Sequence, residues 1–191
     1  MLNAKALSEL LSKNSDERLC KRWYLMTPNG TLLAHTSPTD ARALRNQVAM
    51  TALSWQEHLQ SADPGDMNDQ TASLRDLHTL VIESEVGNVL VRRVQSQLLL
   101  VLEGGVPPRK RSFEPRVIAE GPDGEPLHDG RTAESFVGTS VSSKAESSMS
   151  TATTGVLVLH RQKLDAMAAA IAVAFEQTGF AMPGDGSSQL F

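Results

Sequence analysis

The sequence contains few of the residues that mark several protein classes. Its 191 residues include one cysteine, one tyrosine and two tryptophans, and the formal net charge is -4. A single cysteine allows neither an internal disulfide nor an all-cysteine metal site, which favours a reducing cytosolic compartment. The acidic balance argues against DNA or RNA, because proteins that bind them gather Lys and Arg on one face. We therefore expect no nucleic-acid partner.

Long hydrophobic runs are also missing. The longest charge-free apolar stretch, Ala166 to Phe175, is about half of the roughly 20 residues that a membrane-spanning helix needs. The first residues, MLNAKALSELLSK, carry polar side chains where a signal peptide is apolar, and Leu2 stands where N-myristoylation requires glycine. We expect no direct membrane insertion.

Signatures of catalysis, metal binding and cofactor binding are missing too. The sequence has no phosphate-binding loop with Lys-Ser/Thr and no Gly-x-Ser-x-Gly motif, and its five histidines are scattered. Cys20 has basic neighbours, Lys21 and Arg22, which can lower a thiol pKa, but no nearby histidine base, so a buried or half-buried thiol is the preferred interpretation. We expect no catalytic residue, no metal and no cofactor, and we favour a binding or scaffolding protein over an enzyme.

Composition divides the chain into a core and an insertion. Residues 104–153 hold five prolines, six glycines and a run rich in Ser and Thr. Because this mixture cannot bury a core, we expect a disordered or weakly ordered insertion, and we favour a linker over the alternative that Arg116–Ala119 adds a strand. Residues 180–191 are expected to form a flexible tail. A single domain then comprises residues 1–103 and 154–179, which is an ordinary domain size.

Hydrophobic periodicity predicts the order of the elements. Apolar residues at helical spacing predict an opening helix that stops near Asn14, and Pro28-Asn29-Gly30 between two apolar runs predicts a β-hairpin. A second helix is predicted from Pro38 to Gln60 with Ser37 as its cap. Residues 155–160 fit a strand or a helix, and 162–178 fit a helix. Three further strands are predicted at Leu77–Ser84, Val89–Val94 and Leu98–Leu102. The fold class is therefore α+β, an α/β/α three-layer sandwich with a five-stranded antiparallel sheet.

Two features of this predicted domain indicate a protein partner. Met50 and Leu53 lie away from the main apolar stripe of the helix 38–60, so that helix is apolar on more than one face. The strand Leu77–Ser84 has no neighbouring element in the sequence that must cover its outer edge. A dimer explains both features.

Several segments resemble the roadblock superfamily of small dynein-light-chain-like adaptors. They are MLNAKALSELLSK, YLMTPNGTLLAHTSPTDARA and LVIESEVGNVLVRRVQSQLLLVLEGG. The likeness is greatest to the roadblock subunit of the lysosomal scaffold called Ragulator in animals and the EGO complex in fungi. It resumes at TGVLVLHRQKLDAMA, where the family has its last helix, and thus implies that residues from Gly155 onward are helical. The insertion and the tail depart from the short animal form.

The resemblance implies a non-enzymatic scaffold subunit that pairs with a second roadblock-domain subunit. Together with a lipidated membrane-anchoring scaffold subunit, the pair would hold Rag-type small GTPases at the cytoplasmic face of the late endosome, lysosome or vacuole for target-of-rapamycin signalling. In the family, the second helices pack on each other and the third strands pair edge to edge. The interface residues that this implies are Val48, Ala49, Met50, Leu53, Gln56, Thr79, Leu80, Val81, Ile82 and Glu83.

The superfamily leaves another function open, namely a regulator of a small GTPase or a dynein-type motor light chain. A GTPase activator needs an arginine finger, for which Arg42, Arg45, Arg92 and Arg93 are the candidates. Strand alternation sends Arg92 and Arg93 to opposite faces of the sheet, and the two helix arginines fit an exposed polar face equally well. No single arginine demands the catalytic role, so a scaffold is the preferred hypothesis.

Overall fold

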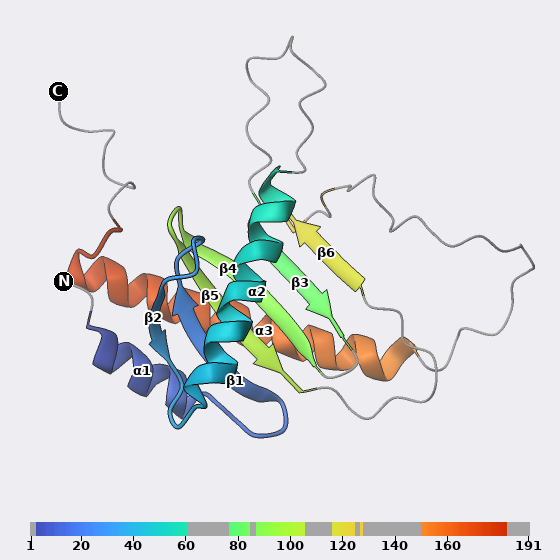
Figure 1. The fold of residues 1–191 in the computed structure, drawn as a ribbon, viewed down its shortest axis with the longest axis horizontal. Helices are drawn as coiled ribbons and strands as arrows, with labels where there is room; N and C mark the ends of the chain where they lie inside the picture. The colour runs from blue at the N-terminus through green and yellow to red at the C-terminus, as the bar shows by residue number, and fades with distance from the viewer. Residues whose placement is uncertain are drawn as a thin grey trace, which may run out of the picture.

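The computed structural model describes residues 3–60, 77–84, 87–105, 116–124, 127 and 150–182. These residues form one sheet and three helices (Figure 1). The elements are α1 (Ala4–Lys13), β1 (Cys20–Met26), β2 (Leu32–His35), α2 (Ala41–Gln60), β3 (Thr79–Glu83), β4 (Asn88–Gln95), β5 (Leu98–Gly104), β6 (Arg116–Glu120) and α3 (Ser150–Thr178). The strands are antiparallel and lie in the order β2-β1-β5-β4-β3-β6.

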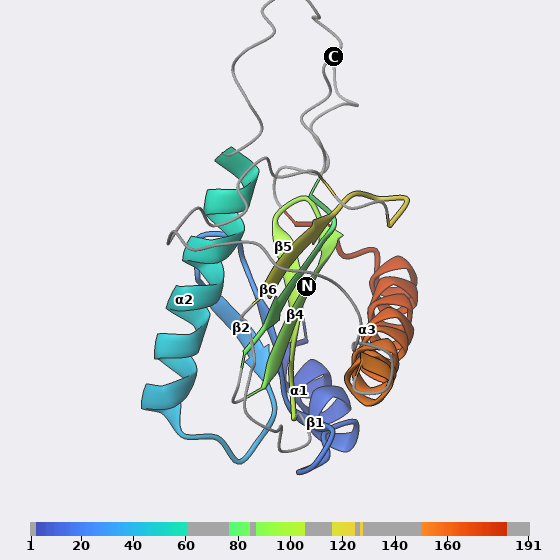
Figure 2. The same ribbon diagram turned by 90° about the vertical axis from the view of Figure 1, so that its right-hand side faces the viewer.

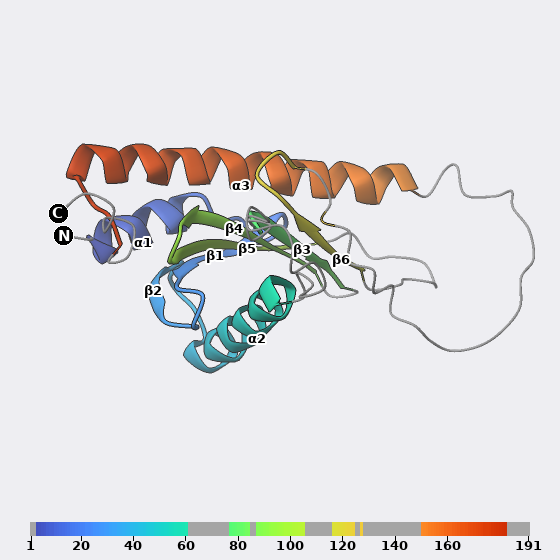
Figure 3. The same cartoon turned by 90° about the horizontal axis from the view of Figure 1, so that it is seen from above.

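The helices cover both faces of the sheet. Figures 2 and 3 show α2 on one face, and α1 and α3 together on the other. Strand alternation supplies a separate apolar core to each side: Tyr24 and Met26 of β1 pack with α2, whereas Trp23 and Leu25 pack with α1 and α3. The predicted α+β three-layer fold is confirmed, with six strands in the sheet instead of five.

The β1–β2 hairpin follows from its turn sequence. Thr27 N–H donates to Thr31 O at 2.9 Å, and Gly30 adopts a φ of 86° between them. Glycine carries no Cβ and accepts this left-handed conformation at little cost, so the Asn-Gly signal placed the hairpin correctly.

The helix α2 begins later than the sequence predicted. It starts at Ala41, and the Asp40 side chain accepts a hydrogen bond from Arg42 N at 2.9 Å. The Asp40 carbonyl accepts the first intrahelical bond, from Leu44 N at 3.0 Å. Asp40, and not Ser37, therefore caps the helix.

The segment 155–160, which fits either a strand or a helix by composition, belongs to the single helix α3 of 29 residues. The inner side of α3 packs on the sheet through Leu164, Met167, Ile171 and Phe175. None of the described helices is both long enough and apolar enough to cross a bilayer.

The region assigned to the tail starts with three ordered residues. The rings of Phe175 and Phe180 lie 4.9 Å apart, and the side chain of Gln95 holds Phe180 O at 3.2 Å and Met182 N at 3.1 Å. Residues 180–182 thus pack on the domain, whereas 183–191 lie outside the described residues.

The preference for a linker over 104–153 is wrong at Arg116–Glu120. These residues form β6, which pairs antiparallel with β3, so Ile118 lies opposite Val81. The strand β3 is consequently an inner strand, and the expected open edge at Leu77–Ser84 is occupied by the chain itself. Residues 106–115, 125–126 and 128–149 of the insertion lie outside the described part of the chain.

Candidate partner interface

The outward face of α2 carries two large apolar side chains in contact with water. Met50 is 61% exposed and Leu53 is 62% exposed. The opposite side of α2 packs on the sheet through Leu44, Val48, Ala52 and Trp55. The prediction that Met50 and Leu53 lie outside the packed stripe is confirmed. Apolar surface of this kind on a folded domain commonly marks a site of association.

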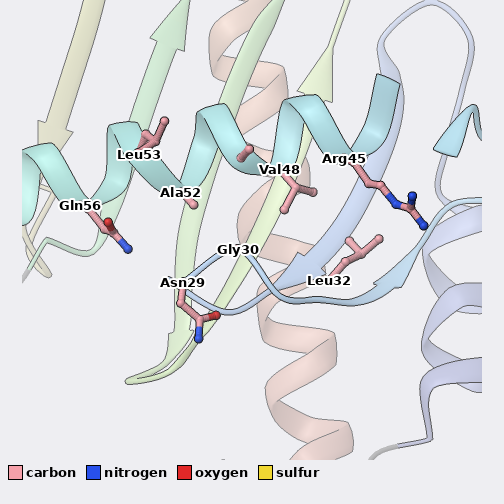
Figure 4. Close-up of a pocket in the computed structure, with 9 residues that line it drawn as sticks. Asn29, Gly30, Leu32, Arg45, Val48, Ala52, Leu53 and Gln56 are labelled. Atoms are coloured by element: carbon pink, nitrogen blue, oxygen red, sulfur yellow. The ribbon is translucent and has the colours of Figure 1, made fainter. Parts of the chain in front are cut away.

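A groove runs beside this face, between α2 and the β1–β2 hairpin (Figure 4). Its volume is about 430 Å³. Gln56 Nε2 donates to Pro28 O at 3.2 Å and holds the hairpin against the helix at one end. The lining residues are Asn29, Gly30, Leu32, Arg45, Val48, Ala49, Ala52, Leu53 and Gln56. Leu53 therefore belongs both to the outward face of α2 and to the groove.

Two contacts hold α2 on the sheet. The hydroxyl groups of Tyr24 and Thr51 lie 3.1 Å apart, and both residues are buried. On β4, the Arg93 guanidinium lies 5.7 Å from the centroid of the Trp55 ring, which is a cation–π distance. These contacts hold the outward face of α2 in one orientation.

Alkaline pH is expected to destabilise the domain through Tyr24. Burial raises the pKa of Tyr24 above its usual value, although the bond to Thr51 opposes this effect. Above about pH 10 the unfolded chain loses the phenol proton and the folded chain keeps it, so stability falls as pH rises. Tyr24 is the only tyrosine. Ultraviolet titration should show no tyrosinate in the folded protein until the alkaline unfolding transition, and a normal phenol titration before unfolding would contradict this.

The ten predicted interface residues fall into two groups. On α2, Ala49, Met50 and Leu53 are exposed, Gln56 is half-buried and Val48 is in the core. On β3, four residues are buried and Ile82 is half-buried, because β4 and β6 flank the strand. Only the α2 group is accessible to a partner in this arrangement.

Sequence reasoning missed the contributions of other segments to this surface. It did not place Asn29, Gly30 and Leu32 of the hairpin beside α2, and it did not assign Arg45 to a groove. The only local signal was the Asn-Gly turn, which predicts a hairpin but not the helix that packs on it.

The arginine candidates are placed as strand alternation predicted. Arg92 contacts Thr79 Oγ1 at 2.8 Å and Asp165 of α3 at 3.0 Å, whereas Arg93 faces α2. Both arginines of β4 thus make contacts within the domain. Arg42 and Arg45 are exposed on α2.

Two further titratable groups in the described part of the chain, Cys20 and Glu103, lie inside the domain and away from the groove. Cys20 is buried as predicted, and burial raises the pKa of its thiol. Glu103 Oε2 lies 3.5 Å from Arg22 Nη1, and burial raises the pKa of Glu103 more than its basic neighbours lower it. No cluster of three His, Cys, Asp or Glu side chains suitable for a metal occurs among the described residues.

No protein-family model matches the sequence, and no curated protein matches it significantly. Solved structures of Roadblock/LC7 domain proteins are similar to the fold. A Roadblock/LC7 domain from Streptomyces avermitilis has a TM-score of 0.41 at 13% identity, over 52% of this chain and 76% of that chain. MglB in a tetrameric arrangement has a TM-score of 0.40 at 18% identity, over 53% of this chain and 72% of that chain. The gliding protein MglB from Thermus thermophilus has a TM-score of 0.37 at 16% identity, over 53% and 73%. Function is therefore inferred from this chain's own residues.

Proposed function

We propose that the chain is a non-enzymatic roadblock-type adaptor that pairs with a second roadblock-domain chain through the outward face of α2. The observation that carries this proposal is the exposure of Met50 and Leu53 beside an apolar groove. Fully burying one such side chain contributes about 1.5–3 kcal/mol, so the two together supply a substantial part of an association free energy. The face is held rigidly by Trp55 and Thr51, which reduces the ordering cost of binding.

The proposal extends to the assembly that the sequence resemblance implies. The roadblock pair would join a lipidated membrane-anchoring scaffold subunit and hold Rag-type small GTPases at the lysosomal or vacuolar surface for target-of-rapamycin signalling. The opening segment MLNAKALSELLSK and the sequence of the strand pair around Glu85 to Asn88 support this extension through their likeness to the Ragulator and EGO subunit. Membrane residence would then come entirely from the lipidated subunit.

A GTPase activator is the weaker hypothesis for this geometry. An arginine finger must reach out of its own domain into a GTPase site. Arg92 and Arg93 are engaged with Asp165 and the Trp55 ring. Only the two arginines of α2 among the four candidates are exposed, and Arg45 borders the groove that the adaptor proposal already uses.

Substituting Leu53→Asp is expected to release the partner chain. It places a carboxylate in the apolar contact, and desolvating that charge without a counter-ion is unfavourable. Val173→Asp is the matched control, because Val173 is 50% exposed on α3, on the other face of the sheet. The measurement is affinity purification of each tagged full-length variant from detergent-solubilised native cells, with identification of its companions.

The wild type and Val173→Asp should recover a second roadblock chain, a lipidated subunit and a small GTPase, and Leu53→Asp should recover none of them. Equal recovery with Leu53→Asp would contradict pairing through α2. Recovery of a roadblock partner without a GTPase or a lipidated subunit would retain the pairing and reject the assembly.

A further inference from the structure

The strand β6 occupies the position at which a partner strand would extend the sheet. It lies antiparallel to β3 over five residue pairs, from Thr79 opposite Glu120 to Glu83 opposite Arg116. In the sequence it is separated from β5 by the segment 105–115 and from α3 by the segment 121–149. No other strand depends on β6 for its pairing in the described sheet, so it can leave β3 without breaking another ladder.

Along β6, the backbone N–H and C=O groups of successive residues point alternately toward β3 and toward the outer edge of the sheet. His78 N donates to Glu120 O at 2.9 Å, and Leu127 N donates to Ala119 O at 2.8 Å from the outer side. Because directions alternate along an antiparallel strand, Ile118 directs its N–H toward β3, whereas Val117 directs its N–H outward.

The side chains hold β6 less firmly than they hold β3. Val117 is 49% exposed and Ile118 is half-buried, whereas Leu80 and Val81 of β3 are fully buried. Glu120 adds an ion pair with Arg161 of α3. Among the described residues, the attachment of β6 thus includes the ladder with β3, the ion pair of Glu120 and the burial of Ala119 and Glu120, whereas Val117 stays exposed.

The sequence of β6 repeats the pattern of β3. Residues 116–120 read RVIAE and residues 79–83 read TLVIE, each with a polar residue, three apolar residues and a glutamate. A second copy of β3 in the place of β6 would put its Glu83 where Glu120 now meets Arg161. Its Val81 would lie opposite the first Val81, so the pairing would have the two-fold symmetry of a closed dimer.

We infer that β6 is an internal substitute for β3 of a second copy of this chain, and that it competes with that copy for the edge of β3. This inference rests on the proposed function, because it regulates the same pairing. In the two-fold arrangement both α2 helices lie on one face of the joined sheet, so displacement of β6 would add a continuous sheet to the contact between outward faces.

A disulfide lock tests this competition in the full-length chain. Ile82 and Val117 lie opposite each other as a non-hydrogen-bonded pair, in which the backbone N–H and C=O groups of both residues point away from the partner strand. The Cα atoms of such a pair are roughly 4.5 Å apart, within the range for a disulfide. Ile82→Cys with Val117→Cys should associate more weakly when oxidised and regain wild-type association when reduced, as measured by sedimentation velocity. Equal association in both redox states would overturn the inference. Cys20 is buried and does not compete for the new thiols.

A pair of proline variants tests the opposite change. Ile118→Pro removes an N–H that points to β3 and should release β6, whereas Val117→Pro removes one that points outward and serves as the control. Both copies must release β6 to pair, so if β6 holds the edge in about nine of ten molecules, its release tightens self-association about a hundredfold. A folded Ile118→Pro variant that associates no more tightly than Val117→Pro would overturn the inference. If Ile118→Pro fails to fold, the disulfide lock decides.

Combining each variant with Leu53→Asp separates this inference from the proposed function. Loss of association with Leu53→Asp, together with no difference between the locked and reduced forms, supports pairing through α2 and rejects competition by β6. If association changes with the redox state of the lock, and Leu53→Asp does not alter that change, the result supports pairing through the edge of β3 and rejects pairing through α2.

Discussion

Replacing Trp55 with alanine is expected to lower the free energy of unfolding by about 3–5 kcal/mol. The Trp55 side chain is completely buried between α2 and the sheet, where it packs with the core that includes Leu80 and Val91. Its removal leaves a large cavity and also takes the ring away from Arg93. Because the domain has only the marginal stability typical of folded proteins, this loss is a large fraction of the total.

Urea unfolding followed by far-ultraviolet circular dichroism measures this effect without relying on tryptophan fluorescence. Trp55→Phe keeps most of the apolar volume and should cost about half as much or less. A loss below about 1 kcal/mol for Trp55→Ala would show that α2 is not held on the sheet through this residue, since that is the range of ordinary surface substitutions.

The second large effect is expected for Gly104→Ala, which should destabilise the domain by about 3 kcal/mol, at the upper end for overpacking. A Cβ at position 104 would lie 2.2 Å from His160 Cε1, well inside contact distance. His160 is fully buried and its Nε2–H donates to Leu19 O at 2.8 Å, so the ring cannot move aside without losing that bond.

A double-mutant cycle isolates this clash. His160→Ala removes the ring, so Gly104→Ala in that background should cost much less than in the wild type. Gly155→Ala is the matched control, because a Cβ there meets nothing within 4 Å inside the helix α3, and it should stabilise the domain by roughly 0.5–1 kcal/mol. Equal costs of Gly104→Ala in the two backgrounds would contradict the predicted contact between residues 104 and 160.

The features that the sequence predicted correctly depend on neighbouring residues. The hairpin is specified by Asn29-Gly30, and the inner stripe of α2 follows from apolar residues three or four apart, including Val48 and Trp55. The same spacing left Met50 and Leu53 outside the stripe, and that is how the exposed half of the candidate interface was found.

The features that it missed depend on residues far apart in the chain. The strand β6 is a short apolar run among prolines, and it becomes a strand because β3 offers it a complete edge. The groove beside α2 likewise needs the hairpin and the helix together. Local composition cannot reveal either arrangement, because both are decided by tertiary packing.

The measurement that tests the central claim most directly is sedimentation velocity of the isolated full-length chain at micromolar concentrations, beside Leu53→Asp. The account predicts that the wild type self-associates as concentration rises, because Met50 and Leu53 leave apolar surface exposed. It also predicts that Leu53→Asp sediments as a monomer with unchanged circular dichroism. A wild type that remains a monodisperse monomer, indistinguishable from Leu53→Asp, would contradict the claim that α2 carries a pairing surface.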